Sequence, residues 1–153
     1  MRALSAIAAG LVLGLAAALP AAACSITNYT PGALRASGDG GTMGSQVGSN
    51  TPATLQILLP LLSGINVDVA APTVIQSGAG YLSAPQTLQV AYTATTLLGI
   101  NVRTQTYTTT ATTFATGLLG AVNMNIVVNN RILNPTGFPA GTYMTQTVIT
   151  CRP

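Results

Sequence analysis

Beyond residue 53 the chain alternates apolar and polar side chains with a period of two, and no other feature constrains the fold as much. Leu55, Ile57 and Leu59 alternate in one segment, and the pattern returns in INVDVA, QTLQVAYTATT, AVNMNIVVN and GTYMTQTVITC. Successive side chains of a β-strand point to opposite faces, so this pattern is typical of strands buried on one face. Short strands separated by Gly and Pro predict an all-β fold, either an antiparallel sandwich or a barrel.

Three stretches outside these runs need separate interpretation. Ser25 to Tyr29 predicts a short opening strand. Thr30 to Pro52 includes GDGGTMGSQVGSNTP, which predicts a long loop with one weak strand at most, because glycine permits turn conformations at little steric cost. Thr112 to Leu119 is the only stretch in which we consider a helical turn, and Gly117 and Gly120 argue against a longer helix.

The chain is unusually poor in charge. Charged residues make up 5% of its 153 residues, with 5 Lys+Arg, 2 Asp+Glu and no His, against about a quarter in an ordinary soluble domain. Acid–base catalysis therefore has almost no side chains to use, and two cysteines without His cannot form a closed zinc site. The net charge of +3 comes from scattered arginines rather than a cluster. We expect no catalysis, no metal, no small-molecule cofactor and no nucleic-acid partner.

The first 23 residues have the pattern of a cleaved signal peptide. Arg2 supplies a positive charge, Ala6 to Leu19 form an apolar stretch, and three alanines precede Cys24. The apolar stretch is shorter than the about 20 residues of a membrane-spanning helix, although an uncleaved N-terminal anchor is the alternative. We expect Met1–Ala23 to be removed and Cys24–Pro153 to form one domain. This domain would be exported to the periplasm, the cell surface or the extracellular medium.

The only two cysteines, Cys24 and Cys151, stand at the two ends of the mature chain. An even number of cysteines in an exported chain predicts a disulfide bond. Such a bond would require the first and last strands to lie side by side, with Cα atoms about 5 to 6 Å apart. The alternative is a lipoprotein anchored to the outer membrane through Cys24. The Ala-Ala-Ala before Cys24 departs from the usual lipoprotein signal, which has Leu three places before the cysteine.

One row of threonines stands out as a candidate binding surface. At a period of two, its five members would share one face of a single strand. A flat row of this kind could match ordered water, as in an ice-binding face, but threonine is also favoured on any solvated β-surface. The members are Thr104, Thr106, Thr108, Thr110 and Thr112.

The few charged residues offer weaker candidates. Asp39 and Asp68 could form a carboxylate pair of the glycosidase kind. Arg35, Arg103 and Arg131 could pair with these carboxylates or bind a sugar or carboxylate, although a role in solubility is the simpler interpretation. The tyrosines are expected to pack in the core or at its rim rather than to stack on sugars; they are Tyr29, Tyr81, Tyr92, Tyr107 and Tyr143.

Both ends of the mature chain resemble one group of bacterial surface proteins. The closing segment FPAGTYMTQTVIT, Phe138 to Thr150, has a Gly-x-Tyr turn at Gly141 and Tyr143 before a strand rich in Thr and Val. The opening Cys24-Ser25-Ile26 follows the signal peptide. These segments are similar to the spore coat protein U-like group, which is related to archaic chaperone–usher pilins.

The resemblance implies an incomplete immunoglobulin-like β-sandwich that is assembled at the cell surface. Subunits of such assemblies donate a strand into a neighbour's open groove. The implied partners are further copies of the chain, other pilus subunits and a periplasmic chaperone. This sequence departs from the family in having no donor extension before Cys24 and in ending on Cys151-Arg152-Pro153 instead of an aromatic residue.

We therefore expect an exported, non-catalytic structural or adhesive protein of the cell surface, similar to a pilin subunit. The alternatives are a secreted monomeric binding module for a polysaccharide or another surface ligand, and a lipid-anchored outer-membrane protein. An enzyme that uses Asp39 or Asp68 ranks last.

Overall fold

The computed structural model describes residues 24–49, 51–59, 64–117 and 123–153. The predicted signal peptide, Met1–Ala23, lies outside these residues. The described parts of the chain form strands β1 to β12 without a helix, and every strand pair is antiparallel. No helix that could span a membrane occurs among them. The predicted all-β, antiparallel fold is confirmed.

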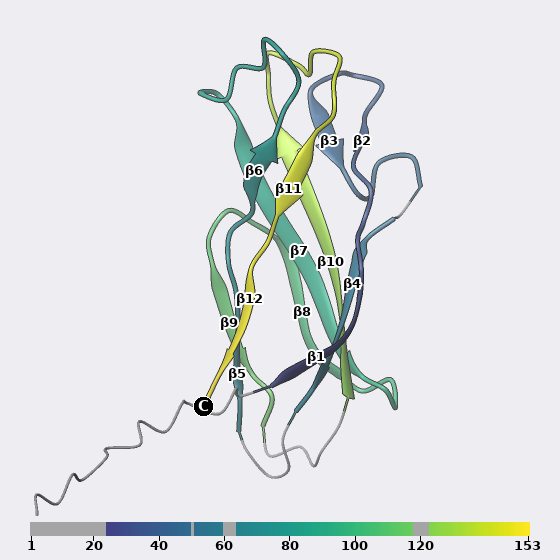
Figure 1. Ribbon diagram of the computed structural model, residues 1–153, viewed down its shortest axis with the longest axis vertical. Helices are drawn as coiled ribbons and strands as arrows, with labels where there is room; N and C mark the ends of the chain where they lie inside the picture. The colour runs from purple at the N-terminus through teal and green to yellow at the C-terminus, as the bar shows by residue number, and fades with distance from the viewer. Residues whose placement is uncertain (1–23, 50, 60–63, 118–122) are drawn as a thin grey trace, which may run out of the picture.

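The larger sheet is organised around the central strand β10, which pairs with β7 on one side and β4 on the other (Figure 1). Beyond the end of β4, the same edge of β10 pairs with β3, which in turn pairs with β2. The outermost strands are β1, next to β4, and β8, next to β7. The strands are β1 (Ser25–Thr30), β2 (Arg35–Ala36), β3 (Thr42–Gly44), β4 (Ala53–Leu58), β7 (Thr87–Thr96), β8 (Asn101–Thr108) and β10 (Asn123–Leu133).

The remaining strands form two small sheets that follow one another along the molecule (Figure 1). One has the order β12-β5-β9 and the other pairs β11 with β6. The predicted single closing strand is thus divided into two, because Thr147 and Val148 interrupt the pairing between them. The bounds are β5 (Asn66–Val69), β6 (Thr73–Gln76), β9 (Thr112–Ala115), β11 (Met144–Gln146) and β12 (Ile149–Arg152).

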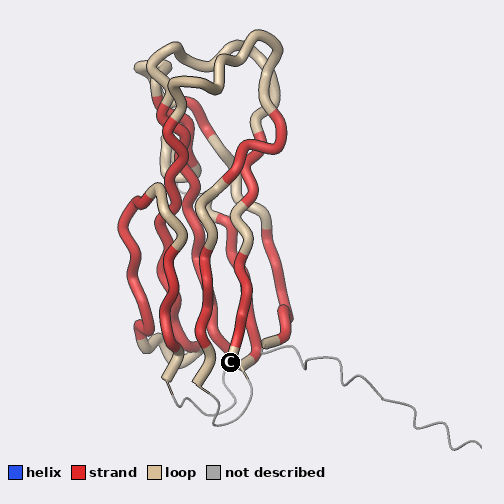
Figure 2. Tube along the Cα trace, turned by 90° about the vertical axis from the view of Figure 1, so that its left-hand side faces the viewer, coloured by secondary structure: helices blue, strands red, loops and turns tan. Residues whose placement is uncertain are grey.

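The large sheet and the β12-β5-β9 sheet bury a shared apolar core. The rings of Tyr92 on β7 and Phe114 on β9 lie 5.8 Å apart between centroids, and the Tyr92 hydroxyl is hydrogen-bonded to that of Thr112. The strands run along the long axis of the molecule and the loops gather at its ends (Figure 2). The alternation predicted this core in its main members, which are Leu55, Ile57, Leu59, Ile65, Val67, Val69, Val90, Tyr92, Met124, Ile126 and Val128.

Two local predictions are wrong. Thr112–Ala115 is strand β9 rather than a helical turn, because Phe114 points into the shared core and the strand pairs with β5; Leu118 and Leu119 lie outside the described residues. The predicted loop from Thr30 to Pro52 contains two short strands, β2 and β3, instead of one at most. The second of these, β3, carries the buried side chain of Met43, which stands opposite the buried Ile132 on β10.

Candidate functional site

A disulfide bond joins the edges of the two layers. Cys24 immediately precedes β1 and Cys151 lies in β12, with their Cα atoms 5.8 Å apart. The predicted pairing and the predicted closeness of the first and last strands are both confirmed. In this bond the Cys24 sulfur is joined to Cys151, whereas the anchored alternative would join it to a lipid. The bond also indicates a non-reducing environment, as expected for an exported protein.

Beside this disulfide, β1 is an open edge of the large sheet. All of its residues are exposed, and in the described chain it pairs with β4 alone. Ile26 stands opposite the buried Ile57, and Tyr29 stands opposite Leu55. Directly opposed residues point to the same face, so Ile26 and Tyr29 both face inward. They are nevertheless 65% and 62% exposed, because the second layer does not reach over them.

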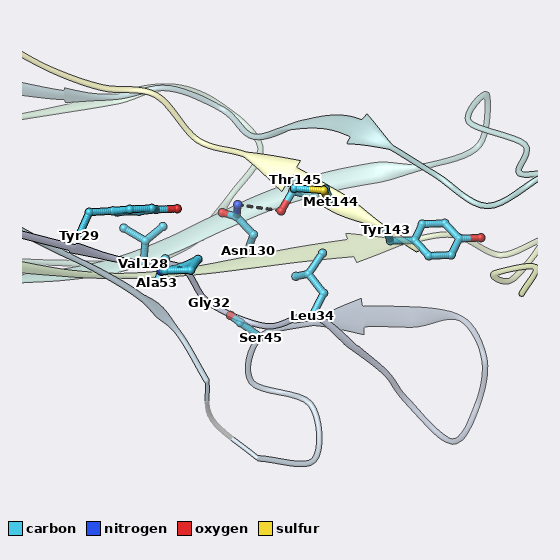
Figure 3. A pocket seen from close by; sticks show the side chains of 11 residues that line it. Tyr29, Gly32, Leu34, Ser45, Ala53, Val128, Asn130, Tyr143, Met144 and Thr145 are labelled. Carbon is cyan, nitrogen blue, oxygen red and sulfur yellow. Dashed lines mark hydrogen bonds between the residues drawn. The ribbon is translucent and has the colours of Figure 1, made fainter. Parts of the chain in front are cut away.

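Two hollows along the uncovered face of β1 are lined in part by Ile26 and Tyr29, and together we call them the groove. Near the disulfide, the groove encloses about 230 Å³ and is lined by apolar side chains. Farther along, the groove encloses about 160 Å³. This volume is similar to that of an engineered protein cavity that binds benzene. Figure 3 shows Tyr29 and Val128 lining this second part. The residues that line the groove include Ile26, Tyr29, Leu55, Ile57, Val128, Asn130 and Ile149.

The polar side chain of Asn130 lines the second part of the groove, next to the apolar Val128. Asn130 follows Val128 on the inner face of β10, and its Nδ2 donates a hydrogen bond to Thr145 Oγ1 at 3.0 Å (Figure 3). Its Oδ1 accepts a hydrogen bond from Thr147 Oγ1 at 2.9 Å. The amide therefore ties the large sheet to the closing segment. Sequence reasoning missed this residue, although an asparagine at the inward position after three apolar ones was a usable signal.

The two carboxylates, Asp39 and Asp68, lie in different parts of the fold. Asp39 lies in the turn between β2 and β3, where hydrogen bonds from the Ser37 hydroxyl and the Gly41 amide lower its pKa. Asp68 lies on β5 in the other layer, and its hydrogen bonds from Arg152 and then Thr113 lower its pKa to about 2. Asp39 and Asp68 share no contact partner, so the carboxylate pair considered from the sequence is not formed.

The threonine row does not form a shared face, and that prediction is wrong. Thr104 is opposite Thr93, whose neighbours Tyr92 and Ala94 are buried, so Thr104 points outward. Thr108 is opposite the buried Val90 and points inward. Register shifts in β8 reverse the alternation between them. Beyond Thr108 the chain leaves the strand and passes into the other layer at β9.

The tyrosines and arginines occupy varied positions. Packing is confirmed for Tyr92 in the core and for Tyr81 and Tyr143, which form an aromatic group with Phe138 at one end of the molecule. Tyr29 is exposed, contrary to expectation. Tyr107 stacks against Arg131 on the outer face of the large sheet.

Neither a metal-ligand cluster in the described residues nor a similar known protein indicates a function for this chain. Among the residues that the structure describes, no three His, Cys, Asp or Glu side chains gather where they could hold a metal ion. Comparisons with protein-family models, curated proteins and solved structures find no match.

Proposed function

We propose that this protein is an exported, non-catalytic structural or adhesive subunit of the cell surface, similar to a pilin subunit. Its groove would receive an extended strand from another subunit of the same assembly, and so complete an immunoglobulin-like sandwich. The observation that carries the proposal is the uncovered inner face of β1, where Ile26 and Tyr29 point inward and remain mostly exposed.

The free edge of β1 supplies the backbone part of the interaction. An edge strand presents unpaired N–H and C=O groups that can pair with an added strand. Alternate side chains of that strand would enter the groove and contact Ile26, Leu55 and Ile149. The occupant is accordingly an extended segment with apolar side chains at every second position. In the periplasm, a chaperone strand could protect the same surface before assembly.

The charge distribution suits such an assembly. The groove lining contains no charged residue, and only 5% of the whole chain is charged. Few ions would therefore lose water when subunits pack together, which keeps the desolvation cost low.

The test uses material sheared from native cells and separated in SDS with and without boiling. We expect a heat-labile series of multiples that contains this chain. Ile26→Asp should abolish the series, because a carboxylate in the groove would be desolvated by the incoming strand. Ile75→Asp is the matched control, since Ile75 is 55% exposed on β6 and does not line the groove. A single monomer band for the unaltered protein in both lanes would contradict the proposal.

A secreted binding module for a polysaccharide is the second candidate, and the outer face of the large sheet favours it. A continuous row of uncharged polar residues crosses all five long strands in register, formed by Asn28, Gln56, Asn125, Thr95 and Asn101. A shallow hollow lies over part of this row, lined by Asn28, Thr54, Gln56, Asn125 and Val127. Amide side chains both donate and accept hydrogen bonds, which suits sugar hydroxyls.

A further inference from the structure

We propose that the outer face of the large sheet carries an oxyanion site, centred on Arg131 and Arg35, that binds the carboxylate groups of an acidic polysaccharide. This inference deepens the second candidate function and rests on it. It does not depend on strand exchange, because the site lies on the face opposite to the groove.

The Arg131 guanidinium is held in place by uncharged partners. Its Nε donates a hydrogen bond to Gln89 Oε1 at 2.8 Å, and its Nη2 donates to the same oxygen. The guanidinium carbon lies 3.9 Å from the centroid of the Tyr107 ring. Tyr107 is itself positioned by a 2.9 Å hydrogen bond from its hydroxyl to Gln46 Oε1. A guanidinium carries five N–H donors, so Arg131 retains N–H groups for a ligand.

A second arginine lies on the same face, two strands away. Gly44 on β3 stands opposite both Arg131 on β10 and Arg35 on β2. Opposed residues share a face, and two strand spacings place the two arginine Cα atoms about 9.5 Å apart. Gly44 has no side chain of its own, but it is buried, and a Cβ atom there would lie 3.5 Å from the Cβ of Arg131. The two arginines therefore belong to one row on the outer face, with the buried Gly44 between them.

No carboxylate neutralises these two charges. The only ion pair in the described chain joins Arg152 to Asp68, in the other layer. Asp39 accepts its side-chain contacts from Ser37 and Gly41. In a chain with 5 Lys+Arg, these two arginines without a carboxylate partner share one row. An oxyanion is the ligand that planar guanidinium groups recognise best.

The surface next to this site identifies the larger ligand. From Arg131, the outer face of β10 continues through Asn129, which is buried and accepts a hydrogen bond from Ser45, and Val127 to Asn125. Asn125 belongs to the uncharged polar row described above. Six residues of strand separate Arg131 from Asn125, a length of about 20 Å. An extended chain of sugars carrying carboxylates could bind the arginines at one end and the amides at the other. The isolated pair of cations is too small for a nucleic acid, whose binding needs clustered basic residues.

The test measures binding of polygalacturonate to the exported protein with its disulfide intact, at low ionic strength, by calorimetric titration. Loss of the charge-assisted hydrogen bonds in Arg131→Gln should weaken binding about tenfold or more. Arg131→Lys should also weaken it, since lysine keeps the charge but lacks the planar fork and the stacking. Arg103→Gln is the matched control, because it removes the same charge from an exposed position on β8. Thermal unfolding of each variant establishes that it is folded.

The outcomes separate this site from general attraction and from the wider function. A loss of polygalacturonate binding in the Arg131 variants but not in Arg103→Gln supports the proposal. Weaker binding of dextran sulfate than of polygalacturonate supports the choice of carboxylate. Equal losses in the Arg131 and Arg103 variants would overturn it, as would an absence of binding or a response to dextran sulfate alone. Binding of neutral dextran that is unchanged in Arg131→Gln would overturn the oxyanion site while leaving the binding module intact.

Discussion

Removal of the Cys24–Cys151 disulfide should cost this protein a large part of its stability. The bond closes a loop with a sequence separation of 127 residues, which is almost the whole domain. In the chain-entropy model a loop of this length restricts the unfolded chain by about 5 kcal/mol at 25 °C. Domains of this size are stable by about 5 to 15 kcal/mol. The double variant Cys24→Ser, Cys151→Ser is therefore expected to be close to unfolding at room temperature.

Urea unfolding followed by tyrosine fluorescence provides the assay, since the chain contains no Trp. With a denaturant slope of about 2 kcal/mol per molar urea, the midpoint should fall by about 2.5 M. Cys24→Ser alone, measured with a reducing agent, should match the double variant, because either change opens the same loop. Thr150→Ser, an exposed change beside Cys151, should leave the midpoint unaltered. A loss below about 1 kcal/mol in the double variant would refute the entropic argument.

Three further predictions concern the buried core, the stability at low pH and the loops. Ile126→Ala should reduce the free energy of unfolding by about 2 to 5 kcal/mol in urea titration, because the side chain is fully buried; Ile75→Ala should cost far less, and equal losses would contradict the assigned core. The pKa of Asp68 is about 2 in the folded protein against an ordinary value of 3.8, so its stabilising contribution is complete above about pH 4 and is lost as the pH falls toward 2. The Asn variant of Asp68 should therefore show a flatter decline of Tm over that range, and an unchanged decline would count against the ion pair. A Cβ atom at Gly141 would lie 2.5 Å from a backbone atom across the loop, so Gly141→Ala should lower Tm, whereas Gly38→Ala, with open space around it, should not.

The alternation in the sequence was sufficient to predict most strands and their buried faces. Leu55, Ile57 and Ile126 are buried because a strand fixes the direction of every second side chain, and burial of the apolar set is then the favourable arrangement. The disulfide was predictable for a related reason. Two cysteines in an exported chain have one possible intramolecular partner each, so Cys24 and Cys151 required no knowledge of the fold.

Features that depend on strand neighbours were not accessible in this way. The register shifts of β8, which separate Thr104 from Thr108 onto opposite faces, arise from pairing with β7 and leave no mark on the local alternation. The oxyanion site likewise brings Arg131 on β10 beside Arg35 and Gly44 on the neighbouring strands β2 and β3, which are far from β10 in the chain.

The sequence by itself determined the fold class, most of the buried residues and the covalent link between the two ends, because each depends on local periodicity or on residue type alone. Only the tertiary structure decided which apolar residues would stay uncovered. Ile26 stands opposite the buried Ile57 and points inward like a core residue. It is nevertheless exposed, because the second layer ends short of β1. The extent of each layer depends on how distant strands pair, and the same pairing produces both the groove and the arginine row.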